Sequence, residues 1–180
     1  MAAYTIDTTH SEISFTVRHM VFAKVRGQFK GWKATLAYDA GNPTSAKVDV
    51  EIDAASIDTR EATRDTHLRS PEFFDADRYP KLTFKATRVE PAGKGHYKLI
   101  GDLTIRDVTR EVALDVEQTG SGKDPWGNDR LGFNLKGTIA RGEWGLVWNQ
   151  ALEAGGVLVS DKVEIEAEVQ VVQAKATKAA

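Results

Sequence analysis

Residues 163–171 read VEIEAEVQV, with a valine, isoleucine or alanine at every odd-numbered position and glutamate or glutamine between them. In an extended strand successive side chains point to opposite faces, so this pattern places one face in an apolar interior and the other in water. Antiparallel sheets commonly have one packed face and one solvated face. The stretch therefore predicts an antiparallel strand with one buried face.

The same period of two recurs along the chain, most clearly in residues 13–19 and 46–53. Turn-forming residues separate such segments, as in DAGNP at 39–43, PAGKG at 91–95 and GSGKDPWGND at 120–129. Together with 163–171, the predicted strands cover residues 13–19, 32–38, 46–53, 82–86, 97–105, 112–116 and 131–139.

About eight strands joined by turns are typical of an all-β sandwich or closed barrel. An eight-stranded antiparallel barrel leaves no exposed sheet edge and can enclose one small ligand. We therefore predict an all-β fold, an eight-stranded antiparallel barrel.

Residues 59–74, TREATRDTHLRSPEFF, interrupt the alternation with helix-forming residues. Pro71, with Pro80 nearby, would end a helix of two or three turns. This segment predicts a short helical insert before the strand at 82–86, with Phe73 and Phe74 anchoring it against apolar surface.

The charge is nearly balanced, with 24 Lys and Arg against 26 Asp and Glu and a formal net charge of −2. This argues against nucleic acid as the main partner, because no excess of cations can neutralise phosphates. The absence of cysteine excludes a disulfide framework, a thiolate nucleophile and cysteine-bound zinc.

The length of 180 residues favours one domain. We expect one ligand-binding domain over residues 1–172 and a disordered tail over 173–180, because QAKATKAA has nothing to bury. The N-terminus lacks a basic region followed by an apolar run, so we expect a cytoplasmic protein, although a trimmed periplasmic protein would look the same. No window approaches the ~20 apolar residues of a membrane helix, and we expect a soluble protein.

Asp65 and His67 raise the possibility of an acid–base pair. In a helix, residues i and i+2 lie on different faces, so we expect instead an exposed polar helix in which Arg64 or Asp65 hydrogen-bonds to a neighbouring loop. The four histidines stand in separate elements without a paired metal motif. We predict no catalytic residue, no metal ligand and no cofactor.

The inward-facing side chains are the candidate ligand-binding residues, and they could either fill the barrel or line a cavity. His19 continues the apolar face of its strand, where it would meet a ligand head group or simply end the strand. Trp144 and Trp148 could form the rim of a cavity or cover the closed end of the barrel. The candidate set is Ile13, Phe15, Val17, His19, Leu36, Leu82, Phe84, Leu99, Leu103, Leu114, Phe133, Leu135, Trp144 and Trp148.

Three motifs occur in order along the chain: RD-x-HL-x-S-x-x-FFD, YP-x-[IL]-x-F and G-x-LTI-x-x-VT. They are close to the signature of the YceI-like, polyisoprenoid-binding family, which the chain resembles. The resemblance runs from Tyr4 to Val171 and is carried by YTIDTTHSEISFTVRH, VRGQFKGWKATLAYD, VEIDAASIDTREATRDTHLRSPEFFDADRYPKLTFKATRV, GDLTIRDVTREVALDV and LGFNLKGTIARGEWGLVWNQALEAGGVLVSDKVEIEAEVQV.

The resemblance implies a lipocalin-like barrel that holds a long isoprenoid or related lipid and is not an enzyme. The expected partner is thus a hydrophobic small molecule, and an uncovered apolar mouth would favour a homodimer. Two alternatives stay open. One is an enzyme acting on an isoprenoid or quinone through His19 with Arg18, or through the Asp65–His67 segment. The other is a stress-related interaction module.

Overall fold

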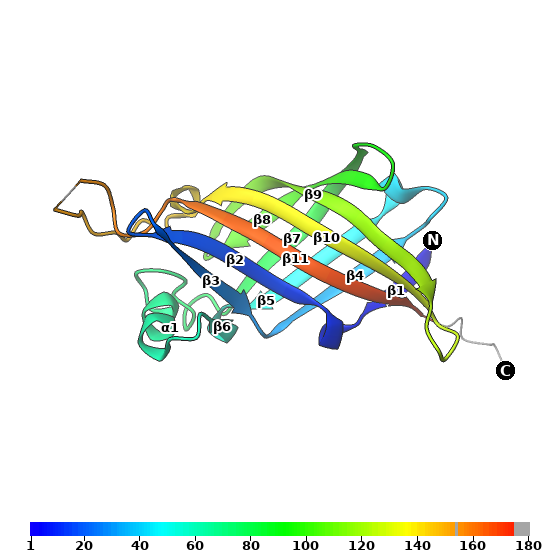
Figure 1. Cartoon of the computed structure of the whole chain (residues 1–180), viewed down its shortest axis with the longest axis horizontal. Coiled ribbons are helices and arrows are strands. Elements are labelled where there is room, and N and C mark those ends of the chain that lie inside the picture. The colour runs from blue at the N-terminus through cyan, green and yellow to red at the C-terminus, as the bar shows by residue number, and fades with distance from the viewer. Residues whose placement is uncertain (154, 175–180) are drawn as a thin grey trace.

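The computed structural model describes residues 1–153 and 155–174 and shows an elongated barrel of antiparallel strands with a helix at one end (Figure 1). The helix is α1 (Ala62–Arg69). The strands are β1 (Ala2–Ile6), β2 (Glu12–His19), β3 (Ala23–Phe29), β4 (Trp32–Tyr38), β5 (Lys47–Asp53), β6 (Ile57–Asp58), β7 (Lys81–Pro91), β8 (His96–Ile105), β9 (Val108–Lys123), β10 (Asp129–Ala140) and β11 (Lys162–Gln173).

Six of these strands are segments of three longer strands, formed by β1 with β2, β3 with β4, and β5 with β6. A short 3₁₀ helix, η1 (Thr8–His10), separates β1 from β2, yet both pair with β11, through Ile6 with Val171 and Glu12 with Glu168. In the same way β3 and β4 pair with β2 and β1, and β6 and β5 pair with β3 and β4. The described residues thus form eight long strands.

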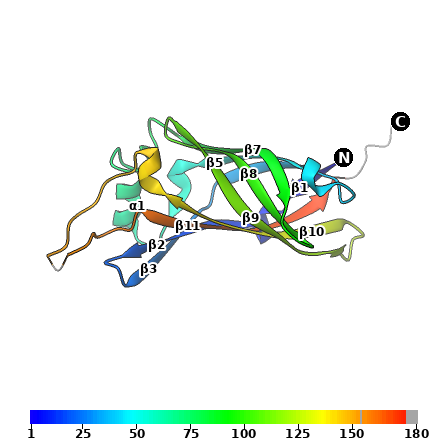
Figure 2. The same ribbon diagram turned by 90° about the horizontal axis from the view of Figure 1, so that it is seen from above.

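Each long strand pairs with the next one along the chain, and β11 pairs with the first to close the ring. The cross-strand pairs are antiparallel throughout. Figure 2 shows the closed wall from a second direction. This confirms the predicted eight-stranded antiparallel barrel, and each predicted strand lies in a different one of the eight.

The sheet extends beyond the predicted strands: β1, β3 and β6 were not predicted, and one predicted turn lies partly in the sheet. Residues 120–123, expected in a turn, continue β9, and only residues 124–128 form the turn to β10. The Asp124 side chain accepts hydrogen bonds from the backbone N–H groups of Trp126 (3.0 Å) and Asn128 (2.9 Å), which closes the turn. Glycines in the GSG sequence suggested a loop, but pairing with β10 holds them in the sheet.

A glycine opposite an aromatic ring shows how the barrel wall accommodates its largest side chains. Phe15 on β2 pairs with Gly27 on β3, and a Cβ on Gly27 would lie 2.3 Å from Cζ of the Phe15 ring. The Phe15 ring therefore lies over the glycine, and its centroid is 5.7 Å from that of the Phe29 ring. Only glycine at this position leaves room for an aromatic side chain opposite it.

The predicted insert contains an α-helix of eight residues. The side chain of Glu61 caps it by accepting from the backbone N–H groups of Thr63 (3.1 Å) and Arg64 (2.6 Å). The helix ends at Arg69, and the extended C-cap residue Ser70 directly precedes Pro71, as expected from the proline. It is therefore shorter than the predicted insert of residues 59–74, and turns fill the rest.

A packed core joins the insert to the barrel. Phe73 is buried, and Phe74 lies edge-to-face against Phe29 with 5.7 Å between centroids. Both aromatic residues therefore anchor the insert, as predicted. The surrounding buried residues are Ala54, Ile57, Ala76 and Trp144.

The end of the chain extends the barrel slightly further than expected. Gln173 belongs to β11 and pairs with Tyr4, and the N–H group of Ala174 donates to the carbonyl of Ala3 at 2.9 Å. Residue 173, predicted to start the tail, is therefore part of the barrel, and the rest of the prediction, from residue 175 to 180, lies outside the described part of the chain.

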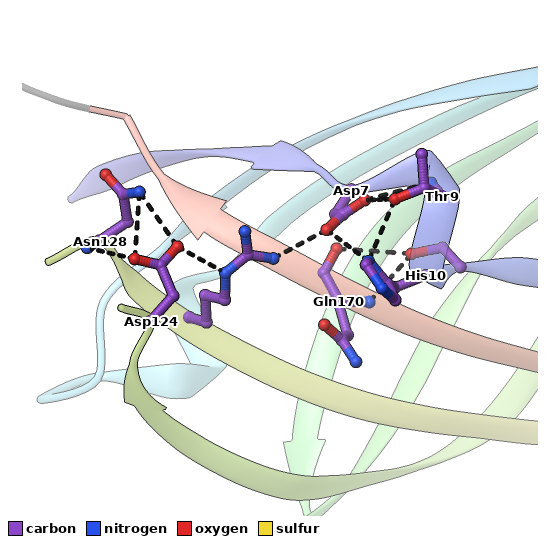
Figure 3. A network of polar contacts seen from close by, with 8 residues as sticks. Asp7, Thr9, His10, Asp124, Asn128 and Gln170 are labelled. Carbon is purple, nitrogen blue, oxygen red and sulfur yellow. Dashed lines mark hydrogen bonds and ion pairs between the residues drawn. The ribbon is translucent and has the colours of Figure 1, made fainter. Parts of the chain in front are cut away.

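An ionic network joins the β9–β10 turn to the point where β1 ends (Figure 3). Arg130 donates to Asp7 Oδ2 at 2.7 Å and to Asp124 Oδ2 at 2.9 Å. Hydrogen bonds from Thr9, Arg130 and His10 hold the pKa of Asp7 well below its usual range. Burial raises the pKa of Asp124, but hydrogen bonds from Asn128 and Arg130 outweigh this effect and lower it overall.

Replacing the shared cation tests this network. A carboxylate whose pKa is lowered by folding stabilises the folded state above its unfolded pKa of about 3.9, and this stabilisation is lost as the pH falls. We expect Arg130→Gln to lower the free energy of unfolding most at neutral pH and progressively less below about pH 4. Urea unfolding across this pH range measures the difference.

The matched control is Lys123→Gln in the same hairpin. Lys123 Nζ lies 2.7 Å from Asp129 Oδ1, but both side chains are largely exposed, so this ion pair should contribute little. A pH-independent loss in Arg130→Gln, or an equal loss in the control, would contradict a stabilising role for the network.

Candidate functional site

The barrel encloses an apolar cavity of about 550 Å³. Its wall comes from the inward-facing positions of the long strands and from the helical insert. The volume lies within the range of roughly 300–1,000 Å³ that is usual for small-molecule sites. The open question of a filled or hollow barrel is therefore answered: the inward side chains surround a space.

Thirteen of the fourteen candidate residues line this cavity. Trp144 is the exception: it is buried in the core beside the barrel, and its indole N–H donates to the Leu103 carbonyl at 2.9 Å. The residues that the structure brings together are Ile13, Phe15, Val17, His19, Leu36, Leu82, Phe84, Leu99, Leu103, Leu114, Phe133, Leu135 and Trp148. Their part in ligand binding remains a prediction.

The candidate set omits other lining residues, including large ones such as Phe29. Smaller residues such as Ala34 and Ala167 stand on the same inward faces, and the alternation could have found them. The insert also contributes Thr63 and Leu68. No local pattern marks these, because their position depends on how the insert packs against the barrel.

Aromatic residues line the cavity at the end far from α1. Tyr38 is buried, and its ring lies edge-on to Tyr4 (6.0 Å between centroids) and Phe133 (5.8 Å). Its hydroxyl donates to Gln118 Oε1 at 3.3 Å. Burial raises the pKa of Tyr38, so the phenol stays neutral at physiological pH.

Polar residues of the lining concentrate at the α1 end, around Thr59. The Thr59 N–H and hydroxyl donate to Asp65 Oδ1 at 2.9 and 2.5 Å. Arg64 donates from Nε to Thr59 Oγ1 and from Nη2 to the Thr59 carbonyl, both at 2.7 Å. As predicted, Arg64 and Asp65 hold a neighbouring loop. Asp65 is buried, however, where an exposed helix was expected, because Thr59 satisfies its carboxylate.

The His67 side chain has different partners from that of Asp65. Its Nε2 contacts the Glu72 carboxylate, and its ring lies edge-on between Phe73 (5.0 Å) and Trp148 (4.7 Å). Asp65 and His67 therefore do not meet, as the helical spacing indicated. His67 and Trp148 both line the cavity at this end.

Arg141 supplies a buried positive charge beside the same end of the cavity. Its guanidinium donates to the carbonyls of Leu146 (2.7 Å) and Ser160 (2.9 Å) and lies over the ring of Phe73. Desolvation lowers the pKa of Arg141 from its usual value, but the carbonyls hydrogen-bond the charged form. The charge thus ties the backbone at Leu146 and Ser160 together beside the barrel.

Comparison with known proteins agrees with this architecture. The family model of the YceI-like domain matches residues 4–171. The chain belongs to the YceI-like family. A UPF0312 protein of Staphylococcus epidermidis is 37% identical over 171 residues, which cover 94% of this chain and 97% of the relative.

Solved YceI-like structures share the fold. The Campylobacter jejuni YceI protein is 31% identical, with a TM-score of 0.76 over 97% of this chain and all of that one. A polyisoprenoid-binding domain from Saccharophagus degradans, implicated in plant cell wall breakdown, has a TM-score of 0.68 over 97% of this chain and all of that domain. At 14% identity, the latter likeness concerns the fold alone.

The described part of this YceI-like chain shows neither a metal centre nor a membrane helix. No group of three or more His, Asp or Glu side chains within residues 1–153 and 155–174 is placed to hold a metal ion. In the same residues, no helix has the length and apolar character needed to cross a membrane.

Asp65, in the RD-x-HL motif of the family, provides a test of the polar end. In Asp65→Ala the buried N–H group of Thr59 loses its acceptor, and an unsatisfied buried donor costs about 1–3 kcal/mol. We expect the free energy of unfolding to fall by this amount, as measured by urea denaturation. Asp77→Ala, which removes an exposed carboxylate just after the insert, is the matched control and should change stability little. Equal losses in both variants would contradict the role given to Asp65.

Proposed function

We propose that this protein binds a long-chain isoprenoid, polyprenyl or quinone-like, or a related amphiphilic lipid inside the barrel and stores or carries it without chemical conversion. The observation that carries the proposal is the cavity of about 550 Å³ with its almost wholly apolar strand lining. Membership of the YceI-like family and the fold shared with a polyisoprenoid-binding domain support it.

The energetics of an apolar wall favour long hydrocarbon ligands. A buried CH₂ group contributes about 0.8 kcal/mol, whereas association costs roughly 4–15 kcal/mol. A ten-carbon chain would therefore gain about 8 kcal/mol and could end near zero net affinity, while a chain of several isoprene units would exceed the cost. A strongly polar ligand would lose its hydration along the strands without gaining hydrogen bonds.

The two ends of the cavity suggest the direction in which the lipid lies. The apolar tail would extend toward Tyr38 and Phe133, where the wall is aromatic. The polar head would lie at the α1 end, where Thr63 and Arg64 join the lining. Asp65 and His67, which an enzymatic alternative would need as a pair, have separate partners in Thr59 and Glu72.

Chain-length preference tests the proposal directly. We expect solvent extraction and mass spectrometry of natively purified protein to yield a stoichiometric hydrophobic compound. Isothermal titration with polyprenyl alcohols should give an affinity that rises steeply with the number of isoprene units. Affinity that is independent of chain length would contradict burial of the tail in the barrel.

Filling the cavity gives a second test. Ala167 lines it from β11, so Ala167→Phe places an aromatic ring in the space that the lipid would occupy. We expect lipid retention to fall at least tenfold in Ala167→Phe while the chain stays folded by circular dichroism. The matched control is Ala113→Phe, at an exposed position on β9, which should retain lipid. Equal retention in the two variants would argue against the cavity as the site.

A further inference from the structure

The turn between β2 and β3 carries apolar side chains in solvent. Met20, Val21 and Phe22, which we call the apolar tip, join the paired residues His19 and Ala23. Phe22 is 82% exposed, and Val21 is 64% exposed. Large hydrophobic side chains gathered at one exposed point of a protein mark an interaction site.

The backbone of the apolar tip is strained as well as exposed. Met20 and Val21 have φ angles of 52° and 70°, in the left-handed region that asparagine and glycine adopt readily. A β-branched valine there is an outlier, and such strain clusters at functional sites. Turn stability alone would favour Asn-Gly at these two positions.

Two basic residues lie on the strands next to the apolar tip. Arg18 and Lys24 are exposed cross-strand partners, and like charges in this relation are destabilising. Within the described residues, the structure shows no carboxylate paired with either of them. Arg26 and Lys30, further along the same hairpin, do pair with Glu12 and Asp58. The two cations nearest the tip therefore lack the neutralisation that their neighbours have.

The apolar tip lies at the end of the barrel that also carries α1 and the loop after β10 (Figure 1). The N–H group of Met20 donates to the carbonyl of Leu158 at 2.8 Å, and His19 bridges to Val159. His19, Leu158 and Val159 line the cavity. The tip is thus joined directly to the wall of the ligand site.

We propose that the apolar tip inserts into the surface of an anionic lipid bilayer, with Arg18 and Lys24 on the lipid head groups. An apolar group that enters the boundary between head groups and acyl chains, backed by basic residues, is the physical pattern of a peripheral membrane contact. The contact would bring the α1 end of the cavity to the membrane. This docking goes beyond lipid binding in the cavity and does not require it.

Flotation of the full chain with vesicles tests the docking. Wild-type protein should float with phosphatidylcholine vesicles that contain phosphatidylglycerol, and binding should weaken as salt is raised. The variant Met20→Asn/Val21→Gly/Phe22→Ser, whose Asn-Gly sequence suits the turn, should bind at least tenfold more weakly. Arg18→Gln/Lys24→Gln should lose about fivefold for each charge removed, and only on the anionic vesicles.

Trp126→Ser is the matched control. Trp126 is 77% exposed in the 124–128 turn at the opposite end of the barrel and should not affect vesicle binding. Lipid that copurifies is quantified in the same samples, because tip variants that keep it while losing the vesicles separate docking from the cavity. The proposal is wrong if the wild type binds no vesicles or if Trp126→Ser lowers binding as much as the tip variant. It is also wrong if ultracentrifugation shows a wild-type dimer that the tip variant converts to a monomer.

Discussion

Closure of the hydrogen-bonded ladder is the constraint on which this structure depends. β11 pairs with β10 on one side and with both β1 and β2 on the other, so the last strand completes a ring with the first. A closed ring has no unpaired edge, and every strand must present alternate side chains to a common interior. The apolar wall, the enclosed space and the position of the insert all follow from this closure.

The interior is hollow because the ring is wide compared with the side chains that it encloses. Eight strands give a barrel just wide enough either to be filled by side chains or to hold one small ligand. Here part of the wall carries small side chains, such as those of Ala34 and Ala167, which leave more of the interior empty. A second group of buried residues, around Phe73 and Trp144, packs between the insert and one end of the barrel.

The two ends of the barrel are built differently, and this asymmetry gives the cavity a direction. At one end, the Arg130 network holds the β9–β10 turn against the end of β1, close to the aromatic cluster at Tyr38. At the other end, Thr59, Arg64 and Asp65 fix the insert through hydrogen bonds. The apolar tip lies at this second end, beside residues that line the cavity.

The sequence by itself determined one segment of each of the eight strands and the face of that segment that turns inward, because alternation is a local property with a period of two. It also marked the insert, since Pro71 and the loss of alternation are local signals. Only the tertiary structure decided that β9 continues through Gly120 and that Trp144 packs beside the cavity. It also decided that the inward-facing side chains enclose a cavity and do not fill the barrel. These features depend on the register of closure and on contacts between residues far apart in the chain, such as Trp144 with Leu103. No short stretch of sequence contains that information.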